Sequence, residues 1–473
     1  MTWKILAVAV SVLAAWRYGA DGERTDIRSS VGTPCRIPGY AHEIECGYLK
    51  VDGAVSAGGM VDTELRWYRI PARARYSLQD PVIWIPGFGI NTVERGASMA
   101  GALKRLLNTR DLIWLEPRGT PPNADEACVP AGAKHLQEQL EPLADADAVK
   151  RCLDAWRLRG GSVASPIRQH AQDLERLRDS LNLQKVNILA EGQGSAVALE
   201  WSSIAPDAVR RVVLDSPILA DNLLEHRAIR MAEALQKAFA ACGQAEECRS
   251  AYPDPRASLR QVRASLPLTL EIPNPQTGRS ESVHLTDAQL ASLVMRILHH
   301  PVRAVVLPAA LQEAAHGDWR PLFGLYALTW PAPHKTFHWE TWLAGFCSGT
   351  PPGTDMPEDE FAAWFFFAER QRYERLCDAW PVQPEPELRT PEALPPLLVL
   401  RGGADPATSM PPAGAEVVLA PGAGHGMLAY GCAADIVYRY VWASDAVGEG
   451  GNGPGTACLE QVPYPLPFVE KGR

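Results

Sequence analysis

Five short apolar runs constrain the fold of this chain more than any other feature. Turn residues close each run, and a helix predicted for residues 167–181 leads directly into the third run. Continuous apolar strands that alternate with helices are typical of a parallel sheet whose two faces are both covered. The sequence therefore predicts an α/β fold. The five runs are Val82–Ile85, Leu112–Leu115, Val186–Leu189, Val212–Leu214 and Leu397–Leu400.

The stretch between the fourth and fifth runs has a different pattern, with helices, proline-rich connections and many aromatic residues. Because strands resume only at Leu397, we expect this stretch to be an insertion that caps a single α/β core. The chain then divides into four parts. They are a signal peptide (1–20), the first part of the core (21–218), a helical, aromatic-rich cap (219–395) and the C-terminal part of the core (396–473).

The N-terminal segment predicts export. Its apolar run, Ile5–Trp16, is shorter than the roughly 20 residues that cross a bilayer, but it fits the apolar region of a secretory signal. An amphipathic or buried N-terminal helix is the alternative. The signal, together with ten cysteines, indicates an oxidising compartment, so we expect a secreted or periplasmic protein with no membrane span after signal removal. A net charge of −9 without a basic run argues against a nucleic-acid partner.

Candidate catalytic residues follow the strands, because open α/β sheets gather function at the carboxyl ends of their strands. Gly87 and Phe88 lie in a glycine-rich turn after the first run, which is typical of a loop that exposes N–H groups as an oxyanion hole. Asp405 follows the last run, and His425 comes twenty residues later between glycines. Each residue alone is a common turn residue. Together, in this order, they predict the Asp and His of a Ser-Asp-His triad.

Longer motifs give a specific resemblance over residues 35–460. Cys35 and Cys46 precede Gly-Tyr-Leu-Lys-Val, Arg118-Gly119-Thr120 follows a strand, and Gly402-Gly-Ala-Asp405-Pro precedes His425-Gly. The chain resembles the secreted proline iminopeptidase and tripeptidyl aminopeptidase family of serine exopeptidases. The resemblance implies the α/β-hydrolase fold, with a mostly parallel sheet, helices on both faces and a large cap before the last strands. It also implies five disulfides: Cys35–Cys46, Cys128–Cys152, Cys242–Cys248, Cys347–Cys377 and Cys432–Cys458.

The family's nucleophilic serine would follow the strand at Val186. Here Gly192 stands at that position, between Glu191 and Gln193, and the chain has no other Gly-x-Ser-x-Gly sequence. Ser195 lies one turn into the next helix, so we do not expect it to replace the serine. Glycine adopts a strained turn at the least cost, so the turn can persist without the nucleophile. Gln193 completes the predicted oxyanion hole.

Other departures concern substrate recognition. Glu116 and Pro117 replace an Asp-Gln pair of the family, and Pro121 replaces a glycine. Ser348 follows Cys347 where the family places acidic residues that recognise the free amine of a peptide. The resemblance therefore leaves exopeptidase specificity in doubt.

Three functions fit the sequence. The first is an aminopeptidase homologue that keeps Asp405 and His425 but has lost serine catalysis. The second is an exported binding or accessory protein that holds a peptide or small molecule in the cleft under the cap. The third is a noncovalent hydrolase of small esters or amides, in which Glu191 or His425 activates a water molecule. The alternative role of Glu191 is to fill space beside the altered turn. No metal and no cofactor are predicted, because the cysteine spacings do not match a zinc site.

Overall fold

The predicted runs form the centre of a nine-stranded sheet in the computed structural model. The structure describes residues 32–52, 55–56, 59–60, 63–121, 128, 135–141, 143, 146–162, 164–219, 223–329, 337–349, 355–382, 394–443 and 455–467. The predicted signal peptide lies outside these described residues. Among them, no helix has the length and apolar character needed to cross a membrane.

The sheet has the strand order β1-β2-β5-β7-β6-β8-β9-β12-β13. The strands from β7 to β13 in this order are parallel, whereas β1, β2 and β5 form an antiparallel edge. The runs at 82–85, 112–115, 186–189, 212–214 and 397–400 all lie in parallel strands. The strands are β1 (Thr33–Cys35), β2 (Ile44–Val51), β5 (Thr63–Ile70), β6 (Val82–Ile85), β7 (Leu112–Leu115), β8 (Val186–Glu191), β9 (Val209–Asp215), β12 (Leu397–Gly402) and β13 (Glu416–Ala420).

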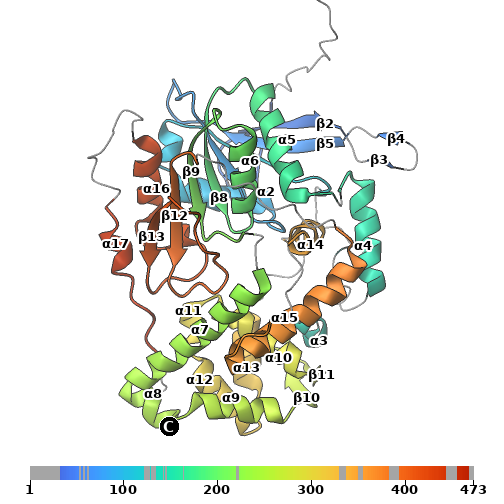
Figure 1. Cartoon of the computed structure of the whole chain (residues 1–473), viewed down its shortest axis with the longest axis vertical. Coiled ribbons are helices and arrows are strands. Elements are labelled where there is room, and N and C mark those ends of the chain that lie inside the picture. The colour runs from blue at the N-terminus through green and yellow to red at the C-terminus, as the bar shows by residue number, and fades with distance from the viewer. Residues whose placement is uncertain are drawn as a thin grey trace, which may run out of the picture.

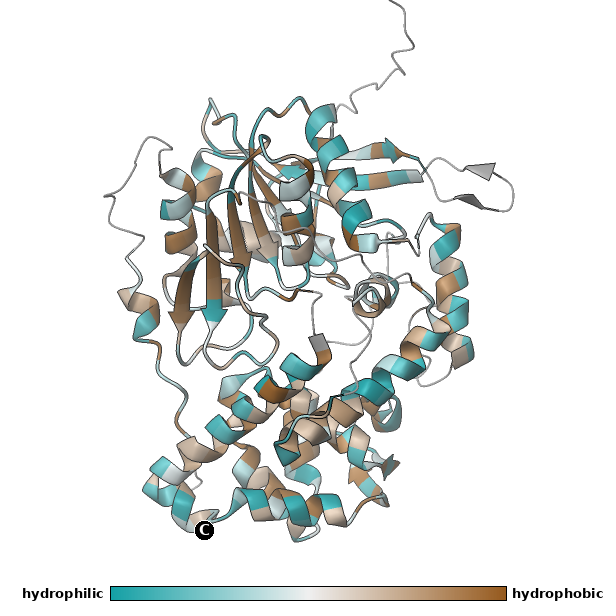
Figure 2. Cartoon of the chain, viewed as in Figure 1, coloured by the Kyte–Doolittle hydropathy of each residue, from teal (hydrophilic) through white to brown (hydrophobic). Residues whose placement is uncertain are grey.

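Helices cover both faces of the sheet, as Figure 1 shows. One face packs on α2 (Thr92–Ala102) and α16 (Ala433–Trp442), and the other on α5 (Pro166–Ser180) and α6 (Gly194–Ile204). Trp84 of β6 faces the first pair of helices and Ile83 the second, so both faces of this strand are apolar. Figure 2 shows the same hydrophobic character along the central strands. The predicted α/β-hydrolase architecture, a mostly parallel sheet with helices on both faces, is confirmed.

A helical cap lies between β9 and β12 in the chain and below the sheet in Figure 1. Its apolar interior includes aromatic residues such as Phe323 and Phe365, both fully buried. The cap elements are α7 (Leu223–Gln244), α8 (Glu246–Ala251), α9 (Pro255–Ala264), β10 (Leu268–Pro273), β11 (Ser280–Leu285), α10 (Asp287–Leu298), α11 (Pro301–Ala304), α12 (Leu307–Ala315), α13 (Arg320–Thr329), α14 (Trp339–Cys347) and α15 (Glu360–Ala379).

Helices α3 (Leu136–Leu140) and α4 (Ala146–Leu158) contact elements of the cap. Helix α3 packs into the apolar interior of the cap, and α4 packs on α14 and α15. Trp156 of α4 lies 5.2 Å from Trp380, measured between ring centroids. The apolar faces of α3 and α4 are thus buried against cap helices that come much later in the chain.

The remaining elements are short, and the cysteines pair across several of them. The five pairs implied by the resemblance are all present: Cys35–Cys46, Cys128–Cys152, Cys242–Cys248, Cys347–Cys377 and Cys432–Cys458. The short elements are β3 (Val55–Ser56), β4 (Gly59–Met60), the 3-10 turns at Leu106–Asn108 and Met427–Ala429, and α17 (Ala457–Glu460).

Candidate active site

A sharp turn connects β8 to α6, and Gly192 stands at its apex with φ +52°. The Gly192 N–H donates to the Asp215 carbonyl at 3.0 Å, and Ile218 N–H donates to the Gly192 carbonyl at 3.0 Å. Gly194 allows β6 to approach closely, because a Cβ atom there would lie 2.3 Å from the Ile85 carbonyl oxygen. The backbone of a nucleophile elbow is therefore present without a nucleophilic side chain.

Asp405 and His425 meet at the carboxyl edge of the sheet. The Asp405 Oδ2 atom lies 3.0 Å from His425 Nδ1, and Oδ1 accepts a hydrogen bond from Ala407 N–H at 2.9 Å. The Thr408 hydroxyl also donates to Oδ2. Burial disfavours the Asp405 carboxylate, but His425 and these hydrogen bonds outweigh it and hold the pKa of Asp405 below its ordinary value. An ionised carboxylate on Nδ1 leaves Nε2 of His425 as the working nitrogen.

The other nitrogen of His425 faces the apex of the elbow. A Cβ atom built on Gly192 would lie 3.7 Å from His425 Nε2 and 3.8 Å from Ile218 Cδ1. A serine hydroxyl extending from that Cβ atom is within reach of a hydrogen bond to Nε2. The structure thus brings the predicted Asp405, His425 and Gly192 together in the spatial order of a triad.

Asp215 and Ser216, at the end of β9, hold the histidine loop and were not among the predicted site residues. Asp215 accepts hydrogen bonds from the N–H groups of Met427 at 2.6 Å and Leu428 at 3.0 Å. Ser216 Oγ accepts one from Gly426 N–H at 2.9 Å. Burial and the nearby Glu191 raise the pKa of Asp215 to about 6. The rule that pointed to Asp405, a polar residue just after an apolar strand, also applies to these two residues.

Three acidic side chains near His425 affect its pKa. Burial disfavours its charged form, but Asp405, Asp215 and Glu191 outweigh this effect and raise the pKa of His425 above its ordinary value. Its side chain is still 36% exposed, whereas that of Asp405 is fully buried. The ring therefore lies between a buried anion and an accessible space, which is the arrangement of a general base.

The contacts of Glu191 argue against a catalytic role for its carboxylate. Its Oε1 forms an ion pair with Arg95 of α2 at 2.6 Å, and its Oε2 accepts a hydrogen bond from Trp84 Nε1 at 2.8 Å. Both carboxylate oxygens are thus occupied, one in joining β8 to α2 and the other in joining β8 to β6. Ser195 is fully buried in the second position of α6, as expected of a residue that is not at the apex.

The predicted oxyanion loop lies beside the elbow. A Cβ atom on Gly87 would lie 3.7 Å from the Gln193 nitrogen, so the turn after β6 and the turn after β8 are neighbours. Helix α14 of the cap supports this loop, since Gly89 N–H donates to Thr341 Oγ1 at 3.1 Å. Gly345 packs so closely that a Cβ atom there would lie 2.7 Å from the Phe88 ring. The N–H groups of Phe88 and Gln193 remain the candidates for the oxyanion hole.

Comparison with protein families decides the fold assignment. Residues 144–306 match the family described as alpha/beta hydrolase fold, and residues 365–446, which include Asp405 and His425, match the family described as TAP-like protein. The chain is an α/β-hydrolase-fold protein.

The curated relatives match only part of their own length. A tripeptidyl aminopeptidase of Streptomyces coelicolor is 26% identical over 192 residues, which cover 37% of this chain and 35% of that protein. A putative hydrolase of Escherichia coli is 21% identical over 291 residues, covering 58% of this chain and 57% of that protein. A solved proline iminopeptidase-related protein from Thermus thermophilus is 16% identical, with a TM-score of 0.33 over 82% of this chain and 92% of that one.

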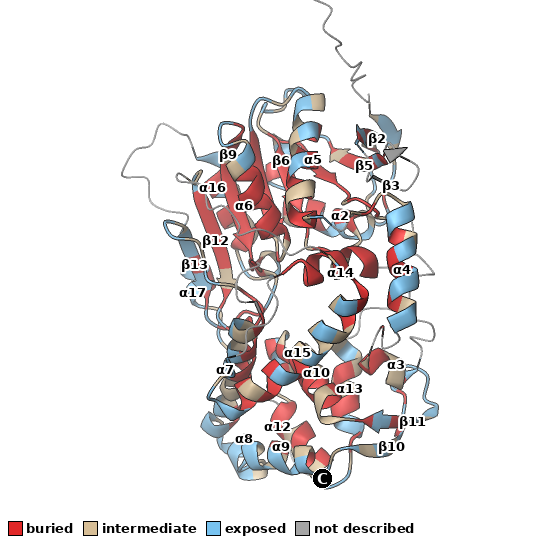
Figure 3. Ribbon diagram, turned by 45° about the vertical axis from the view of Figure 1, so that its right-hand side comes forward, coloured by how far each residue is buried: buried red, intermediate tan, exposed pale blue. Residues whose placement is uncertain are grey.

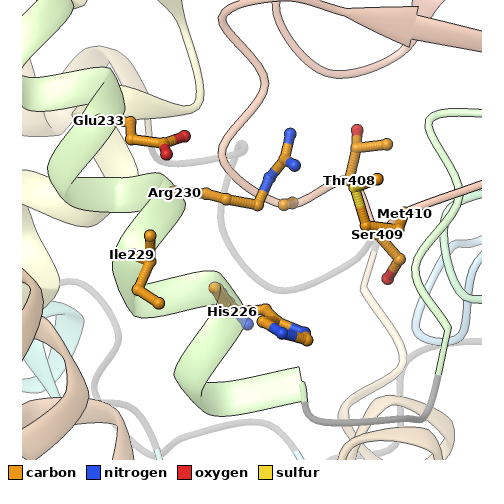
Figure 4. Close-up of a pocket in the computed structure, with 9 residues that line it drawn as sticks. His226, Ile229, Arg230, Glu233, Thr408, Ser409 and Met410 are labelled. Atoms are coloured by element: carbon orange, nitrogen blue, oxygen red, sulfur yellow. The ribbon is translucent and has the colours of Figure 1, made fainter. Parts of the chain in front are cut away.

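Charged side chains of α7 connect the cap to the loop that follows β12. Arg230 donates to the Asp405 carbonyl at 3.1 Å, and Lys237 donates to the Gly403 carbonyl at 3.2 Å. A cavity of about 180 Å³ lies between α7 and the loop around residues 407–410. Figure 4 shows Arg230 extending from α7 across this cavity toward Thr408. The cap thus contacts the loop that carries Asp405.

One group of metal-ligand side chains occurs among the described residues, namely Cys128, Cys152 and Glu340. The two sulfur atoms are joined in a disulfide. Cysteine binds a metal as the thiolate, and a disulfide contains no thiolate. This group therefore does not fit a metal ion.

Proposed function

We propose that this α/β-hydrolase-fold protein is an exported aminopeptidase homologue. It binds a peptide-like ligand in the cleft under the cap and forms no acyl-enzyme. One observation carries the proposal: the apex of the elbow is Gly192, at a distance from His425 that suits a serine. Without Oγ no covalent intermediate forms. Triad enzymes that lack a member retain only a roughly 10³–10⁴-fold advantage over water, from the oxyanion hole and binding.

The substitution Gly192→Ser tests the proposal. If Asp405, His425 and the oxyanion loop still form a working site, the variant gains labelling by a fluorophosphonate probe and cleaves peptide anilides, and the wild type does neither. Gly192→Ala is the matched control, because alanine brings the same Cβ atom and the same strain at positive φ without a hydroxyl. Labelling of the wild type would overturn the proposal, whereas an inert, folded Gly192→Ser protein would show that the site lacks more than the serine.

Export rests on the apolar N-terminal segment and on the five disulfides. Disulfides persist in oxidising compartments. In this chain Cys35–Cys46 lies within the core, and Cys347–Cys377 lies within the cap. The peptide-like ligand is proposed from the TAP-like match and from the partial similarity to a tripeptidyl aminopeptidase. Expression with and without residues 1–20, followed by fractionation, tests the export proposal.

A second candidate function is noncovalent hydrolysis of a small ester or amide. The observation that favours it is the space beside His425 Nε2, which no side chain of residue 192 fills. A water molecule there would give up a proton to Nε2 as it attacks a carbonyl in the oxyanion hole. His425, and not the ion-paired Glu191, is then the base. The test is the rate of p-nitrophenyl acetate hydrolysis. His425→Ala should abolish it, and Glu191→Gln should change it by no more than about twofold. An equal loss of rate in both variants would contradict this candidate.

A further inference from the structure

The cavity between α7 and the loop around residues 407–410 has the features of a small-molecule site. Its volume is about 180 Å³, whereas sites that enclose a whole drug-sized ligand measure roughly 300–1,000 Å³. Ile229 lines it from α7 and Met410 from the loop, and these residues are 41% and 67% exposed. Solvent therefore reaches the cavity, and its size suits a molecule smaller than a drug.

Two arginines and one glutamate line this cavity: Arg227, Arg230 and Glu233. Arg227 already has an acidic partner, because it lies 3.3 Å from Glu369. Among the described residues, Arg230 and Glu233 form no ion pair with each other or with a third side chain. The guanidinium of Arg230 donates instead to the Asp405 carbonyl at 3.1 Å. The cavity thus offers one cation and one anion to a ligand.

Arg230 and Glu233 lie close enough to bind the two ends of one small molecule. They are three residues apart on α7, a spacing that puts their Cβ atoms about 5–6 Å apart on one face of a helix. Figure 4 shows both side chains projecting from the same side of α7. Arg230 Nε is buried and has no hydrogen-bond partner among the described residues, so part of the guanidinium is available to a carboxylate.

The remaining wall of the cavity is partly apolar. Ile229, Ala407 and Met410 contribute hydrocarbon and thioether surface beside the two charges. Methionine is unbranched and flexible, so Met410 can pack against side chains of different shapes. A ligand that uses the whole lining therefore carries a carboxylate, an ammonium group and a short apolar chain.

We propose that this cavity binds a free amino acid with an apolar side chain. Its carboxylate pairs with Arg230, its ammonium group with Glu233, and its side chain packs between Ile229 and Met410. The inference goes beyond the proposed function and does not depend on it, because no group at Gly192 takes part. The occupant would touch the loop that carries Asp405, since Thr408 lines the cavity and donates to the Asp405 carboxylate.

Leucine and three truncated forms of it test the inference on the wild-type protein. The probe 4-methylpentanoate lacks the amino group, 3-methylbutylamine lacks the carboxylate, and glycine lacks the side chain. Leucine should bind at least about tenfold more tightly than each of them, because each probe loses a charge-assisted hydrogen bond or the apolar contact. Titration followed by NMR measures the dissociation constants. No binding of leucine, or equal affinity for leucine and either singly charged probe, would overturn the inference.

Variants of α7 assign the two charged contacts. Glu233→Gln should weaken leucine binding at least about tenfold and change 4-methylpentanoate binding by less than about twofold. Arg230→Gln should weaken leucine binding in the same way and spare 3-methylbutylamine. Glu246→Gln is the matched control, because Glu246 is exposed at the start of α8 and does not line the cavity. Glu233 is exposed too, so its variant keeps the test available even if Arg230→Gln fails to fold. Unchanged leucine affinity in folded Glu233→Gln would overturn the inference.

The histidine signals of the protein locate the bound amino acid. His226 lines the cavity, whereas His316 is exposed at the end of α12 and does not line it. Leucine should therefore shift the ring signals of His226 and leave those of His316 in place. Saturation with leucine that does not shift His226 would put the ligand elsewhere and refute the site. The proposed function fails on a different observation, labelling of the wild type, so the two proposals are tested separately.

Discussion

The α/β core and the helical cap place their charged groups differently. In the core, the sheet interior is apolar, with Trp84 and Trp114 fully buried, and the catalytic charges lie at the carboxyl edge. In the cap, charged groups of Arg372 and Glu369 lie in an interior cavity. Figure 3 shows the buried sheet above and the mixed burial of the cap helices below. The core therefore keeps its ionisable groups at one edge of an apolar sheet, whereas the cap also encloses charged groups in its interior.

The two regions also differ in what holds their functional candidates in place. At the elbow, the backbone conformation is held by hydrogen bonds to Asp215 and Ile218, neither of which involves a side chain of residue 192. The turn is therefore held without any contribution from a side chain at position 192. In the interior cavity of the cap, Glu369 and Glu141 both have arginine partners, so removal of one side chain disturbs several others.

The largest effect should come from the acid of the core. In the Gly192→Ser background, Asp405→Asn should lower kcat by about 10⁴-fold, because an amide can no longer hold His425 in the required tautomer. Steady-state cleavage of a peptide anilide measures it. Arg370→Gln in the same background, in the cap and away from the cavity, should change kcat by less than about twofold. A small effect of Asp405→Asn would mean that the reactive geometry does not reside in the core.

The next prediction asks whether the core and cap unfold together. Leu214 of β9 and Leu293 of α10 are both fully buried, but they belong to separate apolar clusters. Leu214→Ala and Leu293→Ala should each lower the free energy of unfolding by about 2–5 kcal/mol. We expect two transitions in guanidinium chloride, with each variant shifting a different one. A single transition shifted equally by both variants would join the two regions into one cooperative unit.

Much of the core was predictable, because a parallel strand buried on both faces is apolar along its whole length. This is why β6, β7, β8, β9 and β12 were found, and why the residues after them pointed to Asp405 and His425. The antiparallel strands β2 and β5 are not among the apolar runs, and only the family resemblance pointed to a strand at β2, since the residues of both strands alternate between buried and exposed over short stretches. Their pattern is less distinct than that of a wholly buried strand.

The cap was predictable as a helical insertion but not in its contents. Arg227, Arg296 and Arg372, which line its interior cavity, lie far apart in the sequence, and no short motif relates them. Only the packing of α7, α10 and α15 brings them together. The aromatic residues of the cap, which are compatible with a binding surface in sequence, are mainly interior: Trp319, Trp339, Phe365, Phe366 and Trp380 are buried, although Phe367 is 55% exposed.

A pH-dependent prediction concerns Asp215, which ties the histidine loop to the sheet. Its pKa is about 6 in the folded protein and ordinarily 3.8, so the folded state binds the proton more tightly than the unfolded state. Protonation of Asp215 adds about 3 kcal/mol to the free energy of unfolding below about pH 3.8. This contribution is lost as pH rises through about 6. The stability difference between wild type and Asp215→Asn should therefore fall between about pH 3.8 and about pH 6 and stay constant above that range. Urea unfolding at each pH measures it, and a difference that rises with pH would contradict the assignment.

The smallest effects should come from helix N-caps, one in each region. Asn91 accepts hydrogen bonds from two N–H groups at the start of α2 in the core, and Asp359 does the same for α15 in the cap. Asn91→Ala and Asp359→Ala should each cost about 1 kcal/mol. Hydrogen exchange can localise this cost, because a region that opens on its own reports only its own destabilisation. Since the cap has its own apolar interior, Asp359→Ala should speed exchange in α10 and leave β8 unchanged. Faster exchange in β8 would show that the cap cannot open without the core.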